Sequence, residues 1–229
     1  MNPQDLGTRE PQYQRSLDLL KQQGLTPLGL MTNQAWSDDP KHLLFTLSRY
    51  KFVAKMLAGR DHVLEVGCAD AWATRIVVQS VKKLTATDFD PVFVEDVKQR
   101  MDAKWKFDVA QHDLLAGPFL GKYDAAYALD VIEHIQPKDE LVFTGNIAKS
   151  LSAHGTLILG CPSLQSQAYA SPPSKAGHVN CKTGETMRAL LSQFFHNVFV
   201  FSMNDEVVHT GYAPMAHYIF GLGCGRKDA

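Results

Sequence analysis

Residues 63–71 read Val-Leu-Glu-Val-Gly-Cys-Ala-Asp-Ala. The apolar run ends at Gly67, as a buried parallel strand does where it leaves its sheet. Glu65 is an acid inside this run, and a buried carboxylate needs a partner such as a ligand amine or backbone N–H groups. The residues after the glycine are small enough for backbone N–H groups to approach a ligand at the start of a helix; they are Cys68, Ala69 and Ala71. The stretch therefore predicts a strand, a tight turn and a ligand-binding loop.

The composition narrows the class of protein. The chain has 229 residues, 45% of them hydrophobic, which is enough for one large domain or a domain with a cap. A net charge of −1 provides no basic field for nucleic acid or an anionic membrane. The four cysteines form no Cys-x-x-Cys pair, and no apolar signal core or membrane span is present. We therefore expect a cytoplasmic protein with reduced thiols, as a monomer or homodimer.

Strand-like and helix-like segments alternate along the chain. Predicted strands cover residues 62–66, 84–87, 105–110, 124–129, 155–160, 197–201 and 217–223. Predicted helices cover residues 13–23, 40–58, 72–80, 92–101, 139–151 and 183–195. We expect the first helix to pack on the outside of the core and a loop to connect it to the second. The alternation predicts an α/β fold built from parallel βαβ units.

Acids stand at the ends of two of the predicted strands. Asp88 follows the second strand and Asp113 follows the third. In open parallel sheets, ligands bind beyond the carboxyl ends of the strands. Asp88 can accept two hydrogen bonds from a diol, whereas Asp90 is better placed to cap the next helix. Asp113 is either a ligand contact or a solvated loop residue.

A small-residue turn followed by acids at successive strand ends resembles the class I S-adenosylmethionine (SAM)-dependent methyltransferases. Their first motif is an acid with small residues at every second position after it, here Glu65, Gly67, Ala69 and Ala71. Alanine thus stands at two family glycine positions, and we expect cofactor binding to survive this change. The resemblance covers residues from about 40 to 201.

The resemblance implies a Rossmann-like fold with helices on both faces of a seven-stranded, mostly parallel sheet in the order 3-2-1-4-5-7-6. It implies an N-terminal helical extension or cap over residues 1–58 and a SAM-binding domain over residues 59–229. SAM would be the cofactor and S-adenosylhomocysteine (SAH) the product.

Family roles can be carried onto matching positions. Asp88 would bind the ribose diol, and Asp113 with the backbone of Leu114 would bind the adenine amino group. Arg49 would bind the SAM carboxylate through paired hydrogen bonds, or it is a solvated helix arginine. Trp72 would line the pocket or cover the sheet. The expected cofactor-binding residues are Arg49, Glu65, Gly67, Cys68, Ala69, Trp72, Asp88, Phe89, Asp113, Leu114 and Leu129.

The stretch Leu-Asp-Val-Ile-Glu-His-Ile, residues 129–135, is similar to the matching motif of the ubiquinone-pathway O-methyltransferases. A helical turn would bring Asp130, Glu133 and His134 together. His134 could be a general base, with Glu133 beside it, or the Glu-His pair could brace the loop. We expect no metal here; the alternative is a divalent ion held by these three residues.

Two long loops, residues 163–182 and 202–216, are expected to shape the acceptor pocket. His178 is the preferred second base or substrate ligand. Expected substrate contacts are Asp130, Tyr169, Asn180, Asn204, His209 and Tyr212. These polar groups favour a polar acceptor over a quinone.

The sequence therefore predicts methyl transfer from SAM to an oxygen, or in second place a nitrogen, of a small polar acceptor. A sugar, a nucleotide-linked sugar or a cell-surface precursor fits best. One alternative is a quinone or phenolic O-methyltransferase, and another is a non-catalytic SAM-binding protein, because two motif glycines are alanines. Nucleic-acid methylation is disfavoured because the chain lacks a basic patch and the Asn-Pro-Pro-Tyr motif.

Overall fold

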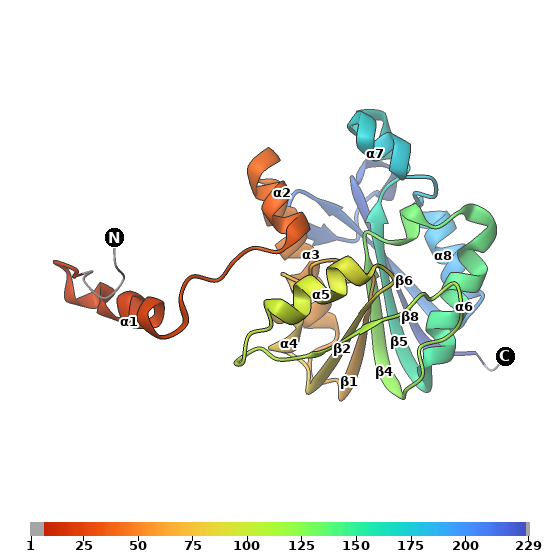
Figure 1. Ribbon diagram of the computed structural model, residues 1–229. Coiled ribbons are helices and arrows are strands. Elements are labelled where there is room, and N and C mark those ends of the chain that lie inside the picture. Colours follow the sequence, from red (N-terminus) through yellow and green to blue (C-terminus); the bar gives the residue numbers. More distant parts are fainter. Residues whose placement is uncertain (1–6, 228–229) are drawn as a thin grey trace.

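One eight-stranded sheet forms the centre of the molecule in the computed structural model, which describes residues 7–227 (Figure 1). Its order is β3-β2-β1-β4-β5-β8-β6-β7. The strands are β1 (His62–Val66), β2 (Lys83–Asp88), β3 (Asp108–Gln111), β4 (Tyr123–Leu129), β5 (Leu151–Pro162), β6 (Phe195–Asn204), β7 (Val207–His209) and β8 (Tyr218–Arg226). Strands β1 to β5 are parallel, and β8 is antiparallel to both β5 and β6. The predicted fold class and the order of its seven strands are confirmed, and β7 is an additional edge strand.

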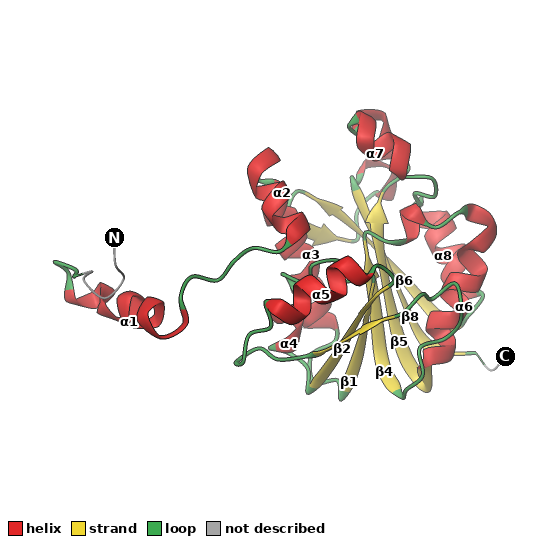
Figure 2. Ribbon diagram, in the orientation of Figure 1, coloured by secondary structure: helices red, strands yellow, loops and turns green. Residues whose placement is uncertain are grey.

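Helices cover both faces of this sheet (Figure 2). They are α1 (Gln14–Gln23), α2 (Leu30–Asp38), α3 (His42–Met56), α4 (Thr74–Val78), α5 (Pro91–Gln99), α6 (Glu140–Ser150), α7 (Pro172–Gly177) and α8 (Gly184–Ser192). Helices α3, α4 and α5 contribute to the core on one face, and α6 and α8 to the core on the other. Both faces of the central strands are therefore buried, which explains their nearly continuous apolar sequences.

The N-terminal region differs from the expected arrangement. Helix α1 forms as predicted, but none of its residues is buried and it lies apart from the sheet (Figure 1). The expectation that it packs on the core is therefore wrong. Helix α3 belongs to the core, where Tyr50, Phe52 and Val53 are buried. The predicted boundary at residues 58/59 thus follows a helix that shares the core of the sheet.

Three segments expected to be loops contain regular structure. Helix α2 forms where a loop was expected, and its first turn is capped by a residue distant in sequence. The segment 163–182 contains α7, and the segment 202–216 contains β7, paired with the end of β6. Asp205 allows that tight hairpin by adopting a left-handed backbone, with φ of 49°. Among the described helices, none is long and apolar enough to cross a membrane.

Candidate cofactor and acceptor site

The loop after β1 has an unusual backbone. Gly67, Ala69 and Ala71 adopt φ values of 70°, 45° and 48°, all in the left-handed region. A Cβ on Gly67 would lie 2.5 Å from Cγ2 of Val131, so only glycine fits there. The two alanines keep the same left-handed geometry at a cost of roughly 1–2 kcal/mol per residue. The family turn is thus retained without two of its glycines.

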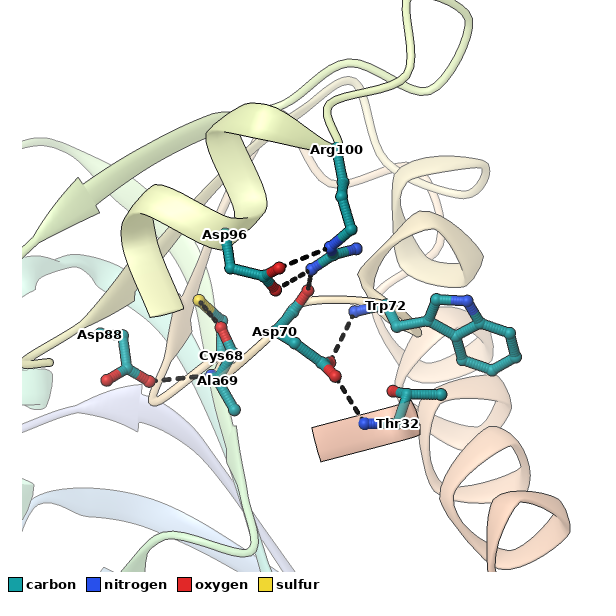
Figure 3. Close-up of polar contacts among 8 residues, drawn as sticks. All are labelled: Thr32, Cys68, Ala69, Asp70, Trp72, Asp88, Asp96 and Arg100. Carbon is teal, nitrogen blue, oxygen red and sulfur yellow. Dashed lines mark hydrogen bonds and ion pairs between the residues drawn. The ribbon is translucent and has the colours of Figure 1, made fainter. Parts of the chain in front are cut away.

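Asp88 ties this loop to β2. Its Oδ2 accepts a hydrogen bond of 2.8 Å from the backbone N–H of Ala69 (Figure 3), and its Oδ1 accepts from Asp90 N. Asp90 caps α5 by accepting from Val92 N, as expected. Asp88 is buried, and each of its oxygens retains acceptor capacity for a ligand hydroxyl.

Glu65 has protein partners of a different kind from those expected. Its two carboxylate oxygens accept hydrogen bonds of 2.7 Å from the hydroxyls of Tyr50 and Thr74. The expected ligand amine or backbone N–H partners are thus replaced by hydroxyls, because α3 and α4 pack directly on this end of β1. Burial raises the pKa of Glu65 to about 7, although hydrogen bonds from Thr74 and Tyr50 act in the opposite direction.

The other expected cofactor residues differ in exposure. Phe89 is 70% exposed at the end of β2. Asp113 is exposed, and its Oδ1 accepts from Leu115 N, so it also orders its own turn. Trp72 is half-buried and packs against the core. Cys68, Leu114 and Leu129 are buried.

Arg49 has a partner within the protein. Its Nη1 donates to both carboxylate oxygens of Asp130, at 2.9 and 2.8 Å, and its guanidinium lies 4.0 Å from the ring centroid of Tyr218. Asp130 itself is in the left-handed region, with φ of 57°. Arg49 is therefore neither a free guanidinium nor a solvated helix residue, and Asp130 is neutralised at the end of β4.

Buried polar atoms without a hydrogen-bond partner gather around this ion pair. Among the described residues they include Arg49 Nε, Glu133 Oε2, Tyr218 OH and His217 Nε2. An unpaired buried polar atom costs about 1–3 kcal/mol, and such atoms favour a ligand that can pair with them. Within residues 7–227, four buried polar atoms without a partner thus lie around the ion pair at the end of β4.

Glu133, His134 and His178 form a second group at this end of the sheet. One ligand atom from each side chain lies within 4.8 Å of the others. Nδ1 of His134 is 3.0 Å from the carbonyl oxygen of Gly177, and Nδ1 of His178 is 3.0 Å from Oε1 of Gln167. Since both partners are acceptors, each Nδ1 carries the proton and each Nε2 keeps a lone pair. The expected metal alternative is thus changed: His178 joins the group, while Asp130 is bound to Arg49.

The charges in this group are mutually dependent. Burial, and then repulsion from Asp130, hold the pKa of Glu133 well above its usual range. Burial and the neighbouring His134 lower the pKa of His178. A neutral histidine beside an acid that resists ionisation is an arrangement that a bound cation would relieve.

Three of the expected substrate contacts hydrogen-bond within the protein. Asn180 donates from Nδ2 to Glu140 and accepts from Lys182 Nζ. Nε2 of His209 is 2.9 Å from Oδ1 of Asn204, whose Nδ2 donates to a backbone carbonyl, so this pair orders the β6–β7 hairpin. These amides and this imidazole satisfy local backbone and side-chain groups because the loops are folded.

The aromatic side chains of the same loops are exposed to solvent. Tyr169 is 92% exposed and Tyr212 is 71% exposed. Met215 and Leu164 are also exposed nearby in sequence. The freely available side chains of these segments are thus more apolar than the sequence suggested.

Sequence reasoning missed several residues at the site. Tyr50 and Thr74 hold Glu65, Tyr218 covers Arg49, and Asp70 contacts helix α2. Asp70 lies inside the first motif, so an unexplained acid in a small-residue loop was a usable signal. The other three belong to apolar segments whose hydroxyls carry no sequence pattern.

Comparison with known proteins agrees with this geometry. Residues 63–155 match the methyltransferase domain family. The fold is similar to the N-methyltransferase NodS from Bradyrhizobium japonicum in complex with SAH, with a TM-score of 0.60 and 18% identity over 96% of this chain and 100% of that one. It is also similar to a TehB-like SAM-dependent methyltransferase from Corynebacterium glutamicum, with a TM-score of 0.62 and 12% identity over 84% and 95% of the two chains. No curated protein matches the chain.

The fold, the loop after β1 and the methyltransferase domain matched over residues 63–155 together define a class I SAM-dependent methyltransferase. Its cofactor is SAM, and its activity is transfer of the SAM methyl group. The residues present fit this cofactor: the loop at Gly67 has no room for a side chain, and the buried acids Glu65 and Asp88 stand at neighbouring strand ends.

Restoring the two family glycines should stabilise the protein. Ala69→Gly and Ala71→Gly each remove left-handed strain and should raise the free energy of unfolding by about 1 kcal/mol, after the entropy cost of glycine. Urea unfolding of the single variants checks this. Ala73→Gly is the control, because Ala73 has φ of −82° and should lose stability. If Ala69→Gly and Ala71→Gly also lowered the stability, the two alanines would not be strained.

Asp88→Ala should weaken SAH binding by about 1.5–3 kcal/mol, the value of hydrogen bonds to a charged group. Calorimetric titration of the wild type and the variant measures this loss. The matched control is Asp90→Ala, which removes only the cap of α5 and should leave the affinity nearly unchanged. Equal affinities of wild type and Asp88→Ala would remove Asp88 from the cofactor site.

The pKa of Glu65 predicts a pH-dependent stability. The pKa of Glu65 is about 7 in the folded chain against an ordinary value of 4.5. Between these two pH values Glu65 is protonated in the folded chain and ionised in the unfolded chain, so folding takes up a proton and stability falls as the pH rises. The contribution is therefore full below pH 4.5 and is lost as the pH approaches and passes 7, by up to about 3 kcal/mol. Urea unfolding without cofactor should show a shallower decline for Glu65→Gln than for the wild type. The exposed control Glu185→Gln should follow the wild type, and parallel curves for all three proteins would refute the shifted pKa.

Proposed function

We propose that this methyltransferase acts on a hydroxyl oxygen of a small polar acceptor, with a divalent cation held by Glu133, His134 and His178. The observation that carries the proposal is the convergence of the three ligand atoms within 4.8 Å beyond the end of β4. A hydroxyl must lose a proton to accept a methyl group, so an oxygen acceptor needs this second site, whereas a neutral amine does not.

The three residues fit a cation in their hydrogen bonding. Glu133 is buried, and its Oε2 lacks any hydrogen-bond partner. Each histidine is oriented through Nδ1, the arrangement that supports metal-binding imidazoles in proteins. Two imidazoles and one carboxylate suit manganese, iron or zinc, and leave positions open for an acceptor.

The remaining site residues would hold the cofactor. Asp88 would accept from the ribose hydroxyls, and the backbone of residues 67–69 would face the amino-acid end. Asp113 and Leu114 would border the adenine, with Phe89 as an apolar edge. The Arg49–Asp130 pair would separate this half from the acceptor half and keep Asp130 from competing for the cation.

Methyl transfer requires no covalent intermediate with the protein. SAM supplies a methyl group on a sulfonium leaving group, so alignment of the acceptor oxygen with that methyl supplies much of the rate. A divalent cation lowers the pKa of a hydroxyl that it binds. The chain itself orients the two histidines, keeps Glu133 away from water and covers Arg49 with Tyr218.

A phenolic acceptor is the second candidate. The exposed side chains of Tyr169, Tyr212 and Met215 favour an aromatic ring, since the polar groups of the same loops are used internally. Turnover with a panel of sugars, nucleotide-linked sugars, catechols and hydroquinones separates the two classes. Methylation of amines alone would overturn the choice of oxygen, and SAH binding without any turnover would favour the non-catalytic alternative.

The cation site predicts a specific pattern of binding. Mn²⁺ should bind the wild-type protein, and Glu133→Gln or His178→Ala should weaken Mn²⁺ binding at least about 10-fold, with SAH affinity little changed. Titration calorimetry with MnCl₂ in the absence of acceptor measures this directly. His154→Ala is the matched control, because His154 is exposed on β5.

Activity then separates a cation from a protein base. Chelation should abolish turnover, and Mn²⁺ should restore it. If Mn²⁺ does not bind and chelation has no effect, while His134→Ala or His178→Ala lowers turnover, the histidine acts as a base instead. Wild-type turnover in both histidine variants would reject both roles.

A further inference from the structure

Helix α2 begins directly on the cofactor loop. Its N-cap residue is Gly29, which has no side chain to cap the helix. The cap comes instead from Asp70, whose Oδ2 accepts a hydrogen bond of 2.6 Å from the backbone N–H of Thr32 (Figure 3). Both Asp70 and Thr32 are buried. A loop residue 38 positions further along the chain thus replaces the missing local cap.

The capping carboxylate is held in place by its surroundings. Oδ1 of Asp70 accepts from the backbone N–H of Trp72, and the carbonyl of Asp70 accepts from Arg100 (Figure 3). Arg100 is in turn paired with Asp96, one turn earlier on α5. The position of Asp70 therefore depends on the loop and on α5 together.

The body of the protein covers little of α2. Thr32 is its only buried residue, whereas Leu30, Met31 and Trp36 are 50%, 53% and 57% exposed. The approach at Gly29 is close, since a Cβ there would lie 2.4 Å from Asp70. Because one carboxylate supplies the cap and the contact, the docking of α2 responds directly to the geometry of Asp70.

Cofactor binding affects the backbone conformation around Asp70. Asp70 lies between Ala69 and Ala71, both in the strained left-handed region, and Ala69 is bonded to Asp88. A ligand that binds this loop and Asp88 stabilises these backbone angles, and with them the direction of the Asp70 side chain. Helix α2 stands beyond the carboxyl ends of the strands, the side at which the cofactor binds (Figure 1).

We propose that α2 is a lid latched by Asp70, and that docking of α2 and binding of the cofactor strengthen each other. Cofactor binding orders α2, and docked α2 slows release of SAH. Asp70 is a positioning residue in this device, since it acts through the loop and the helix. The inference rests on SAM as the cofactor and is independent of the acceptor and of the cation.

Hydrogen exchange of the full-length protein tests the coupling. Saturating SAH should slow exchange of the first-turn amides of α2 in the wild type, including that of Thr32. Asp70→Ala should abolish this effect, weaken SAH binding and speed SAH dissociation, each by about fivefold or more. Asp70→Asn should restore part of each effect, because its amide oxygen can still accept from Thr32.

Two further variants keep the test decisive. Gly29→Ala leaves the loop sequence intact but places a methyl group against Asp70, so it should reproduce the faster dissociation without lowering the stability of the core. Asp38→Asn, at the exposed end of α2, is the control and should behave as the wild type. Dissociation rates are measured by stopped-flow displacement of SAH, and thermal unfolding monitors the fold.

The outcomes are distinct. Exchange of α2 that SAH does not change in the wild type would overturn the coupling. So would unaltered SAH dissociation in both Asp70→Ala and Gly29→Ala. Failure of the wild type to bind SAH would instead count against the cofactor assignment itself.

Discussion

The site depends on the need of several buried carboxylates, at the carboxyl end of the sheet, for hydrogen-bond partners. Glu65, Asp70, Asp88 and Glu133 are all buried beyond or near the carboxyl ends of β1, β2 and β4. A buried charge is costly unless other groups hydrogen-bond to it. Glu65 is satisfied from α3 and α4, Asp88 from the loop after β1, and Asp70 from α2. The hydrogen bonds to these acids hold α2, α3 and α4 against the carboxyl end of the sheet, where the cofactor binds.

Glu133 is the exception among these acids, because its Oε2 has no partner and its pKa is raised. The unsatisfied acid lies beside two histidines whose proton positions are set by neighbouring oxygens. The acids on the cofactor side are therefore hydrogen-bonded within the protein, while the proposed acceptor side keeps an acid oxygen without a partner. This difference is the physical basis for placing the second chemical function at the end of β4.

The ion pair of Arg49 and Asp130 lies between the two halves. The guanidinium comes from α3 and the carboxylate from the turn after β4, so the pair joins α3 to the sheet. Tyr218 from β8 covers the pair, which brings the C-terminal hairpin to the same point. Arg49 is buried whereas the side chain of Asp130 is 35% exposed, so the loss of Asp130 would leave a buried guanidinium without its carboxylate partner.

Prediction from sequence succeeded where the signal is local. The strands β1 and β4, the turn at Gly67 and the cap at Asp90 all follow from apolar runs, glycine and short-range capping rules. Helix α2 was missed because its cap is supplied by Asp70, far along the chain. The hydrogen bonds of Asn180, Asn204 and His209 within the protein were not foreseen, because a polar side chain in a loop reads the same whether it faces a ligand or its own backbone.

The sequence by itself determined the alternation of strands and helices, the small-residue loop and the acids at strand ends, because each is a pattern within a few neighbouring residues. Only the tertiary structure decided the partners of those acids. It pairs Arg49 with Asp130, places two hydroxyls where they donate hydrogen bonds to Glu65, and brings His178 close to Glu133. These choices depend on which segments meet at the sheet edge, and the burial and charge found there have no counterpart in local sequence.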